Sequence, residues 1–267
     1  MTLPINLVLV RHGQSEGNAA KRLSEEGNHS AFSPEFRMRH TASFRLTERG
    51  RNQAERAGKW LRENGFGSFG RYMASAYARA MESAALLELP EAEWMLDPYL
   101  TERNWGDIDN MPQDELAAQF GEALLRRDVE PFFWRPPNGE SFLDLCLRVD
   151  RVLDTLHREC SDQNVVIVCH GEVMRAFQVR LERLTQEEFK HLVLSQEDWD
   201  RIHNCQIVQY SRQNPLSGEL ATHADWVRII RPTDSPVRQS EWRTIIRHRR
   251  SNQELLEMVN RFPAMLA

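Results

Sequence analysis

Two short stretches of the chain are apolar at almost every position, residues 6–10 and residues 164–169. Runs of this kind, which lack the alternation of a half-exposed strand, are typical of parallel strands that are covered on both faces. Shorter strand candidates follow at residues 71–75, 205–211 and 224–230. The pattern therefore predicts a sheet with a buried, parallel centre.

Helical patterns lie between these strands. Thr47 is a good N-cap residue, and the apolar residues of the helix after it share one face: Ala54, Ala57, Gly58 and Leu61. Residues 78–89 and 111–127 also have helical patterns. Ser141, with Asp144 three residues later, has the spacing of a capping box at the start of another helix.

Strands that alternate with helices imply an α/β fold, here a three-layer α/β/α sandwich on a mainly parallel sheet. The length of 267 residues suits one large domain, and we expect a single domain over residues 1–267. Three segments depart from the alternation. We predict a long inserted loop at about 19–45, a cap-like insertion at about 105–140 and a basic helical tail at about 241–267.

Charge is unevenly distributed along the chain. The formal net charge is −5, which argues against a general nucleic-acid binder. Residues 228–261 hold eight arginines and four acids, a net charge of +4, so the remainder carries −9. The predicted loop is also basic, with Lys21, Arg22, His29, Arg37, Arg39, His40 and Arg45.

Composition excludes several classes of protein. No apolar stretch approaches the ~20 residues that span a bilayer, so no membrane partner is expected. The first apolar run is also too short for a signal peptide. The four cysteines show no metal-ligand spacing, which predicts free core thiols and a cytoplasmic protein: Cys146, Cys160, Cys169 and Cys205. Without an H-E-x-x-H motif or an aspartate-rich cluster, we expect no metal and no other cofactor.

Cationic side chains follow three of the predicted strands. His12 and His170 each come just after an apolar strand, Arg11 precedes His12, and Arg79 follows the strand at 71–75. Because the carboxyl ends of parallel strands form the ligand-binding edge of an open sheet, these groups should converge there. Such a cluster needs an anion, and the planar guanidinium suits phosphate oxygens. A helix that starts near Gly171 would add its free backbone amides.

At this point the chain resembles a known family, the histidine phosphatase superfamily with its phosphoglycerate-mutase-like fold. The resemblance is carried, in chain order, by "RHGQSEGN", "LTERGRNQA", "SAYARAMESA", "LTERNWG", "PNGESF", "VCHGEVMRAF" and "HNCQIVQY". It implies that the whole chain forms one catalytic domain. It implies further that His12 is a nucleophile that becomes phosphorylated, and that Glu102 is the proton donor. The remaining matches imply phosphate contacts by Arg11, Asn18, Arg79, Gly171 and His170. The resemblance implies that His170 is also catalytic.

The implied chemistry is physically reasonable. Neutral imidazole is a competent nucleophile toward phosphorus, and a covalent intermediate divides one displacement into two. Fixed cations stabilise the charge on the transferring phosphoryl group. A carboxylic acid with a raised pKa can protonate the leaving alkoxide and then deprotonate the attacking water.

Several residues keep two interpretations. Asp107 is a substitute candidate for the acid. Arg126 and Arg127 resemble an arginine pair that meets the substrate carboxylate in phosphoglycerate mutases, or they are a solvated helix end. The aromatic residues at 132–134 line the cleft or pack the insertion. Within the basic loop, Arg37 and Arg39 select substrates with a second anionic group, or they pair with surface acids.

The sequence therefore predicts a phosphomonoester hydrolase whose partner is a small phosphorylated substrate, with a phosphoprotein as another option. One alternative is a phosphoglycerate-type mutase. Three departures weaken it: the longer loop after Asn18, the shorter insertion after Glu102, and Glu172 where mutases carry asparagine. The other alternative is a non-catalytic protein that binds a phosphorylated ligand. Such a protein would not need the proton donor.

Overall fold

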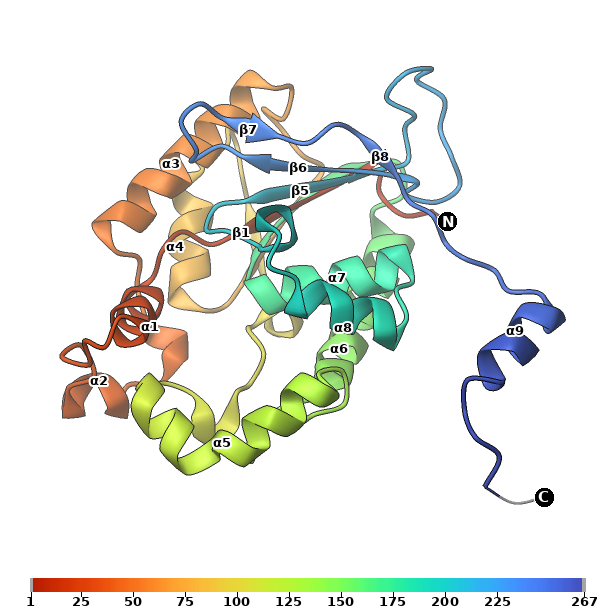
Figure 1. The fold of residues 1–267 in the computed structure, drawn as a ribbon. Coiled ribbons are helices and arrows are strands. Elements are labelled where there is room, and N and C mark those ends of the chain that lie inside the picture. Colours follow the sequence, from red (N-terminus) through yellow and green to blue (C-terminus); the bar gives the residue numbers. More distant parts are fainter. Residues whose placement is uncertain (1, 266–267) are drawn as a thin grey trace.

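A mixed sheet forms the centre of the protein, whose computed structural model describes residues 2–265 (Figure 1). In the described residues the strand order is β3-β2-β4-β1-β5-β6-β7, and β8 pairs with β6. The strands are β1 (Asn6–Arg11), β2 (Arg71–Ser75), β3 (Trp94–Asp97), β4 (Asn164–Cys169), β5 (Ile207–Ser211), β6 (Trp226–Arg231), β7 (Arg238–Gln239) and β8 (Arg243–Thr244).

Helices cover both faces of this sheet, which confirms the three-layer α/β/α fold. They are α1 (Glu16–Glu25), α2 (Pro34–Met38), α3 (Glu48–Glu63), α4 (Ala78–Leu86), α5 (Gln113–Val129), α6 (Phe142–Glu159), α7 (Gly171–Glu182), α8 (Gln186–Leu194) and α9 (Asn252–Val259). Helices α3 and α4 pack on one face, whereas α6, α7 and α8 pack on the other (Figure 1).

The two apolar runs form the middle of the sheet as predicted. β1 pairs in parallel with β4, and β2 pairs in parallel with both β4 and β3. Successive residues of β1 point to opposite cores, Leu7 and Leu9 toward α6 and α7, and Val8 and Val10 toward α3 and α4. Both faces are buried, so no polar alternation is needed. The antiparallel β5 to β8 extend the sheet beyond β1.

The prediction of a long loop at 19–45 is wrong. Helix α1 begins directly after the β1 turn because Ser15 and Asn18 form a capping box. Ser33 caps α2, Pro34 stands at its first position, and a short 3₁₀ helix follows at Thr41–Ser43. Helix α1 buries only Ala20 and Ser24, so it has no apolar stripe from which its period could be read.

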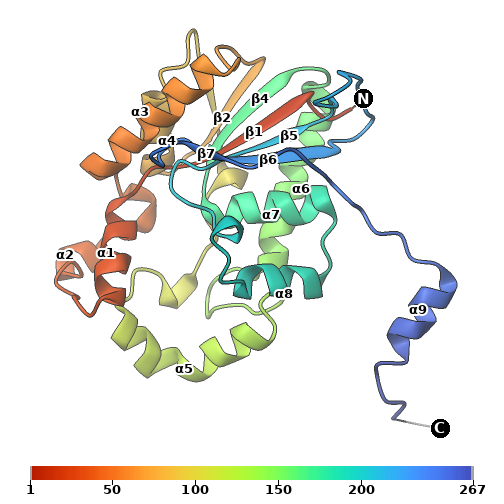
Figure 2. The same cartoon turned by 45° about the horizontal axis from the view of Figure 1, so that its top comes forward.

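The prediction of a helical tail at about 241–267 is correct only for residues 252–259 and is wrong for 241–251 and 260–265. Arg243–Thr244 is strand β8, and the chain stays extended because Arg247 donates to Asp225 and to the carbonyl of Ala224. Helix α9 begins only at Asn252, with Ser251 as its cap, and lies apart from the rest of the protein in both views (Figures 1 and 2). Residues 266 and 267 lie outside the described residues.

The insertion at about 105–140 consists of a 3₁₀ helix (Gly106–Ile108), helix α5 and an irregular segment. Helix α5 has no buried residue, and its backbone leaves helical geometry at Phe120. In Figure 2 α5 lies away from the sheet and extends between α1 and the region of α8. Within residues 2–265, no helix combines the length and apolar character that crossing a membrane requires.

Candidate active site

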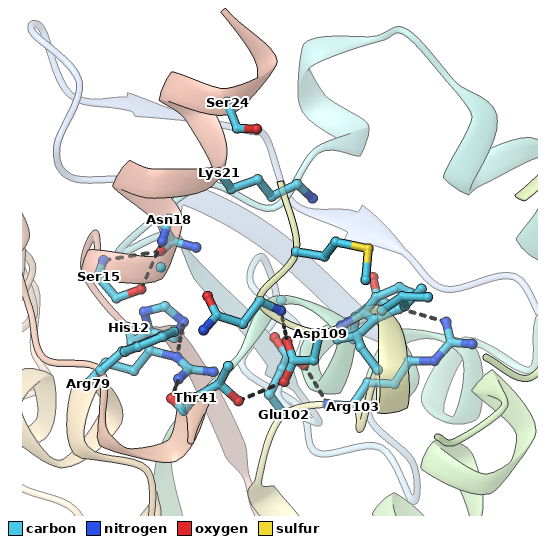
Figure 3. Close-up of a pocket in the computed structure, with 18 of the residues that line it drawn as sticks. His12, Ser15, Asn18, Lys21, Ser24, Thr41, Arg79, Glu102, Arg103 and Asp109 are labelled. Carbon is cyan, nitrogen blue, oxygen red and sulfur yellow. Dashed lines mark hydrogen bonds and ion pairs between the residues drawn. The ribbon is translucent and has the colours of Figure 1, made fainter. Parts of the chain in front are cut away.

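A cleft of about 420 Å³ lies at the carboxyl ends of β1, β2 and β4. It is lined by seven of the nine residues that the sequence suggested: Arg11, His12, Asn18, Arg79, Glu102, Arg127 and Gly171. His170 lies directly behind the lining, with its ring centroid 5.1 Å from that of His12. Figure 3 shows His12 and Arg79 together on one side of the cleft, and Glu102 and Arg103 further across it.

His12 is held as a neutral ring with one nitrogen free to react. Its Nδ1 lies 2.7 Å from the carbonyl oxygen of Gly13, which can only accept, so Nδ1 carries the hydrogen. Nε2 therefore has the lone pair, and Arg79 Nε donates to it at 3.2 Å. Burial, followed by the charges of Arg79 and Arg11, holds the pKa of His12 well below its usual value. The ring is therefore neutral at pH 7, with its lone pair on Nε2.

The turn after β1 depends on two glycines that touch. A Cβ at Gly13 would lie 2.2 Å from the carbonyl oxygen of Gly50 in α3, and one at Gly50 would lie 2.0 Å from that of Gln14. The amide of Gly13 also donates to Ser83 Oγ at 3.0 Å. These contacts explain why the first two sequence motifs both contain glycine. They fix the backbone that carries His12.

Two buried side-chain nitrogens in the site have no protein partner. Arg11 Nη1 donates to the carbonyl of Ile202 at 2.5 Å, but its Nε has no acceptor. His170 Nε2 bonds to Ser75 Oγ at 2.8 Å, and its Nδ1 is unpartnered. Only four buried side-chain nitrogen or oxygen atoms in residues 2–265 lack a partner, and two of them meet here. Buried polar groups normally find partners, so the arrangement suits an anionic ligand.

Two helix N-termini face this ligand position. Asn18 lies in the first turn of α1 and accepts from the side-chain amide of Asn204 at 3.1 Å, which also donates to the carbonyl of His12. Gly171 is the first residue of α7 and lies against the Arg11 guanidinium. The amides of a first helical turn have no partner within the helix, and they favour anions. In α1, however, the amides of Glu16 and Asn18 already donate to the Arg45 carbonyl and to Ser15 Oγ. Asn204 was not identified from the sequence.

Glu102 provides a carboxyl group that can hold a proton near neutral pH. Burial raises its pKa to about 7, and the negative charge of Glu172 adds to the effect against the opposing charge of Arg79. The substitute candidate Asp107 is exposed, accepts from the Asn138 amide and does not line the cleft. The geometry therefore favours Glu102 as the acid.

Five charged residues of the cleft were not predicted as site residues: Lys21, Arg103, Asp109, Glu172 and Arg175. Arg103 is buried between the rings of Trp105 and Trp134, and its Nη1 lies 3.5 Å from Glu172 Oε2. Arg175 lines the cleft from α7. The sequence could have indicated two of them only by their closeness to predicted site residues. Arg103 directly follows Glu102, and Glu172 comes two residues after His170.

The two neighbouring arginines of α5 point in different directions. Arg127 lines the cleft and pairs with Asp128 at 2.9 Å. Arg126 pairs with Glu122 on the exposed side of the helix and does not line the cleft. The aromatic residues at 132–134 do not line it either, and Phe132 packs against Phe142 and Phe189.

Three of the four arginines of the 19–45 segment are engaged by acids, and none of the four lines the cleft. Arg37 forms two hydrogen bonds with Glu115, at 2.9 and 2.8 Å, and Arg39 pairs with Glu16 at 3.2 Å. Arg45 pairs with Glu82 at 3.0 Å. These contacts favour the second interpretation of Arg37 and Arg39, that they pair with surface acids, over the selection of a second anionic group.

We expect the double variant Arg37→Ala/Arg39→Ala to lose stability without changing selectivity. Exposed ion pairs contribute about 0.2–1 kcal/mol each, so the loss of two corresponds to a fall in Tm of about 1–8 °C in a protein of this size. The ratio of KM values for a doubly charged and a singly charged phosphate should stay within twofold of the wild type. A selective rise in KM for the doubly charged substrate would contradict this assignment.

Among residues 2–265 there is no group of three or more histidine, cysteine, aspartate or glutamate side chains with the arrangement of a metal site. All four cysteines are free and buried.

The comparisons with known proteins agree with this geometry. A sequence model of the histidine phosphatase superfamily (branch 1) matches residues 7–209. The chain is 33% identical over 192 residues to a 2,3-bisphosphoglycerate-dependent phosphoglycerate mutase of Methylobacterium radiotolerans, which covers 70% of this chain and 83% of that protein.

Two solved structures have the same fold. A mycobacterial glucosyl-3-phosphoglycerate phosphatase aligns with a TM-score of 0.60 and 25% identity, over 77% of this chain and 92% of that one. A putative α-ribazole-5′-phosphate phosphatase of Escherichia coli aligns with a TM-score of 0.59 and 21% identity, over 83% and 96%.

Proposed function

Since the chain belongs to the histidine phosphatase superfamily, we propose that it is a phosphomonoester hydrolase that works through a phosphohistidine at His12. The observation that carries the proposal is the pairing of two groups in one cleft. His12 presents a neutral Nε2, and Glu102 retains a proton up to about pH 7. A nucleophile and an acid in these protonation states suit the cleavage of a phosphate ester.

In the first step His12 Nε2 attacks phosphorus and the P–O bond to the alcohol breaks. The leaving oxygen takes the proton of Glu102, and the alcohol departs. In the second step water attacks phosphorus, passes a proton to Glu102, and the P–N bond breaks to release inorganic phosphate. Arg11, Arg79 and the amides at Gly171 stabilise the charge on the equatorial oxygens in both steps.

A phosphoglycerate-type mutase is the second candidate function, because the curated relative from Methylobacterium carries that name. Two acids of the cleft support the hydrolase instead, although six lysine or arginine side chains also line it. Glu172 lines the cleft and engages Arg103, so this arginine is matched by a protein carboxylate. A second acid, Asp109, also lines the cleft. Both acids oppose a substrate with a second negative charge.

One assay separates the two functions. The enzyme is incubated with 3-phosphoglycerate and with a neutral alkyl phosphate, each with and without 2,3-bisphosphoglycerate, and inorganic phosphate and 2-phosphoglycerate are measured. Release of phosphate from the alkyl ester, independent of bisphosphoglycerate, supports the hydrolase. Bisphosphoglycerate-dependent formation of 2-phosphoglycerate, with little phosphate released, contradicts it and supports the mutase.

The pKa of Glu102 should set the alkaline limit of kcat/KM. Because the protonated form is the acid, activity on an alkyl phosphate should fall as the pH rises through about 7. The Glu172→Gln variant removes a negative charge that raises this pKa and leaves Arg103 uncompensated. Both effects lower the pKa of Glu102, so the alkaline limb should move to lower pH.

The measurement is a pH profile of kcat/KM on one alkyl phosphate, so that the ionisation of the substrate is the same for both proteins. The control is Glu122→Gln, which removes an exposed carboxylate of α5 outside the cleft. An alkaline limb that stays in place or moves upward in Glu172→Gln would show that Glu172 does not tune the acid.

We further propose that the partner is a small phosphorylated molecule and that the protein works in the cytoplasm. Four buried thiols without disulfides support a reducing compartment.

A further inference from the structure

Apolar side chains line part of the cleft, alongside polar and charged ones. Besides Trp105, which lies against Arg103, six large apolar side chains line it, of which only Phe44 is itself buried and the others are half-buried: Phe32, Phe44, Ile108, Met111, Leu116 and Ile202. Half-buried apolar groups gathered in one hollow are a surface that gains free energy when a ligand covers them. We call this set the apolar roof.

Five of the six members of the roof come from two segments that are far apart in the sequence, and Ile202 comes from a third. Phe32 and Phe44 come from residues 24–44, and the next three members come from residues 105–116. Polar contacts join the segments, among them Thr41 Oγ1 to Asp109 Oδ2 at 2.8 Å.

Three further bonds reinforce this connection. The side-chain amide of Asn110 donates to the Phe36 carbonyl at 2.9 Å, the backbone amide of Gln113 donates to Ser24 Oγ at 2.8 Å, and Arg37 binds Glu115. The roof is therefore formed before a ligand arrives, which reduces the entropy lost on binding.

Two of the three cations near the roof already have acceptors. Arg127 is paired with Asp128, and Arg175 donates to Gln178 Oε1 at 2.6 Å and to a backbone carbonyl, whereas Lys21 is exposed with its Nζ 4.0 Å from Glu25. By contrast, the unpartnered buried nitrogens of the site belong to Arg11 and His170 at the catalytic end. The cleft thus has unpartnered polar groups at the catalytic end and mainly paired cations beside the apolar roof.

From this division we infer that the alcohol part of the substrate is uncharged, predominantly apolar and larger than a three-carbon unit. The inference rests on the proposed hydrolase function and names its substrate class. The volume of about 420 Å³ supports it, since cavities of about 300–1,000 Å³ hold drug-sized ligands.

The first experiment measures kcat/KM for ethyl, butyl, hexyl and octyl phosphate, with 3-phosphoglycerate as the doubly charged comparison. One buried methylene contributes ~0.8 kcal/mol, so kcat/KM should rise roughly threefold to fourfold per methylene until the roof is covered. Butyl phosphate should exceed 3-phosphoglycerate. Values that do not change with chain length, or a preference for 3-phosphoglycerate, would overturn the inference.

A second experiment measures binding to the apolar roof without the hydrolysis reaction. Alkylphosphonates of the same chain lengths, which cannot be hydrolysed, are titrated into the enzyme by calorimetry. The Kd should fall with chain length, and the heat-capacity change should be negative. This result without any phosphate release would refute the hydrolase and retain the apolar site. Hydrolysis together with a Kd that does not depend on chain length would refute the apolar site and support the hydrolase.

A matched pair of variants on α5 locates the site. Leu116→Ala should lower the ratio of kcat/KM for octyl over ethyl phosphate about tenfold, mainly through KM. Leu125→Ala removes a leucine of the same helix that is 69% exposed outside the cleft, and it should leave both values unchanged. Equal ratios in the two variants would overturn the assignment of the apolar roof.

Discussion

Replacement of His12 by alanine is expected to lower kcat by about 10⁴-fold or more, because losing a nucleophile has effects of this size in covalent enzymes. No neighbouring side chain can take over. His170 lies 5.1 Å away, but its Nε2 is bonded to Ser75. The His12→Ala protein should stay folded, since the removed ring lies between the like charges of Arg11 and Arg79.

The decisive measurement is the chemistry of the trapped intermediate. Wild-type enzyme quenched during turnover should carry acid-labile, base-stable phosphate, as expected for a phosphohistidine, and His12→Ala should carry none. The control is His157→Ala, which removes an exposed histidine of α6. Circular dichroism establishes that each variant is folded. Substantial turnover by a folded His12→Ala protein would refute the mechanism.

Glu102→Gln should affect substrates according to their leaving groups. An alkoxide needs a proton when it departs, and a positioned acid contributes about 10²–10⁴-fold, so alkyl phosphates should slow by that factor. An aryl oxide leaves with little help and should slow much less. Glutamine keeps the size of the side chain, so the difference between the two substrate classes reports the proton and not a change of shape.

The comparison needs one aryl and one alkyl phosphate at several pH values. In the wild type the alkyl rate should decline as the pH rises through about 7, and in Glu102→Gln this dependence should disappear. Asp107→Asn is the matched control, because Asp107 is exposed and bonded to Asn138. Equal slowing of both substrates by Glu102→Gln would show that the acid is another group.

The sequence by itself was sufficient for the centre of the fold and for the groups that gather at the catalytic edge. The continuous apolar runs at 6–10 and 164–169 identified two parallel strands, because only a strand covered on both faces lacks alternation. The structure places these two strands side by side. Parallel strands end at the same edge, so Arg11, His12 and His170 had to meet there. The sequence shows which residues lie at this edge because each of them directly follows its strand in the chain.

Other features depend on contacts between distant residues and were decided only by the tertiary structure. Helix α1 was not predicted, because it buries so few of its residues that its sequence shows no helical periodicity of apolar positions. The charges of Arg37 and Arg39 were visible in the sequence, but not their acids, since Glu115 lies 78 positions beyond Arg37.

The same limit applies within the cleft. Arg126 and Arg127 are neighbours, yet consecutive helical residues point about 100° apart, and only the position of α5 decides which one faces the cleft. The effect of Glu172 on the pKa of Glu102 and the six members of the apolar roof likewise arise from packing between separate segments. Sequence patterns report which residues are buried, whereas pairs of polar groups and the walls of a cleft arise only when the segments come together.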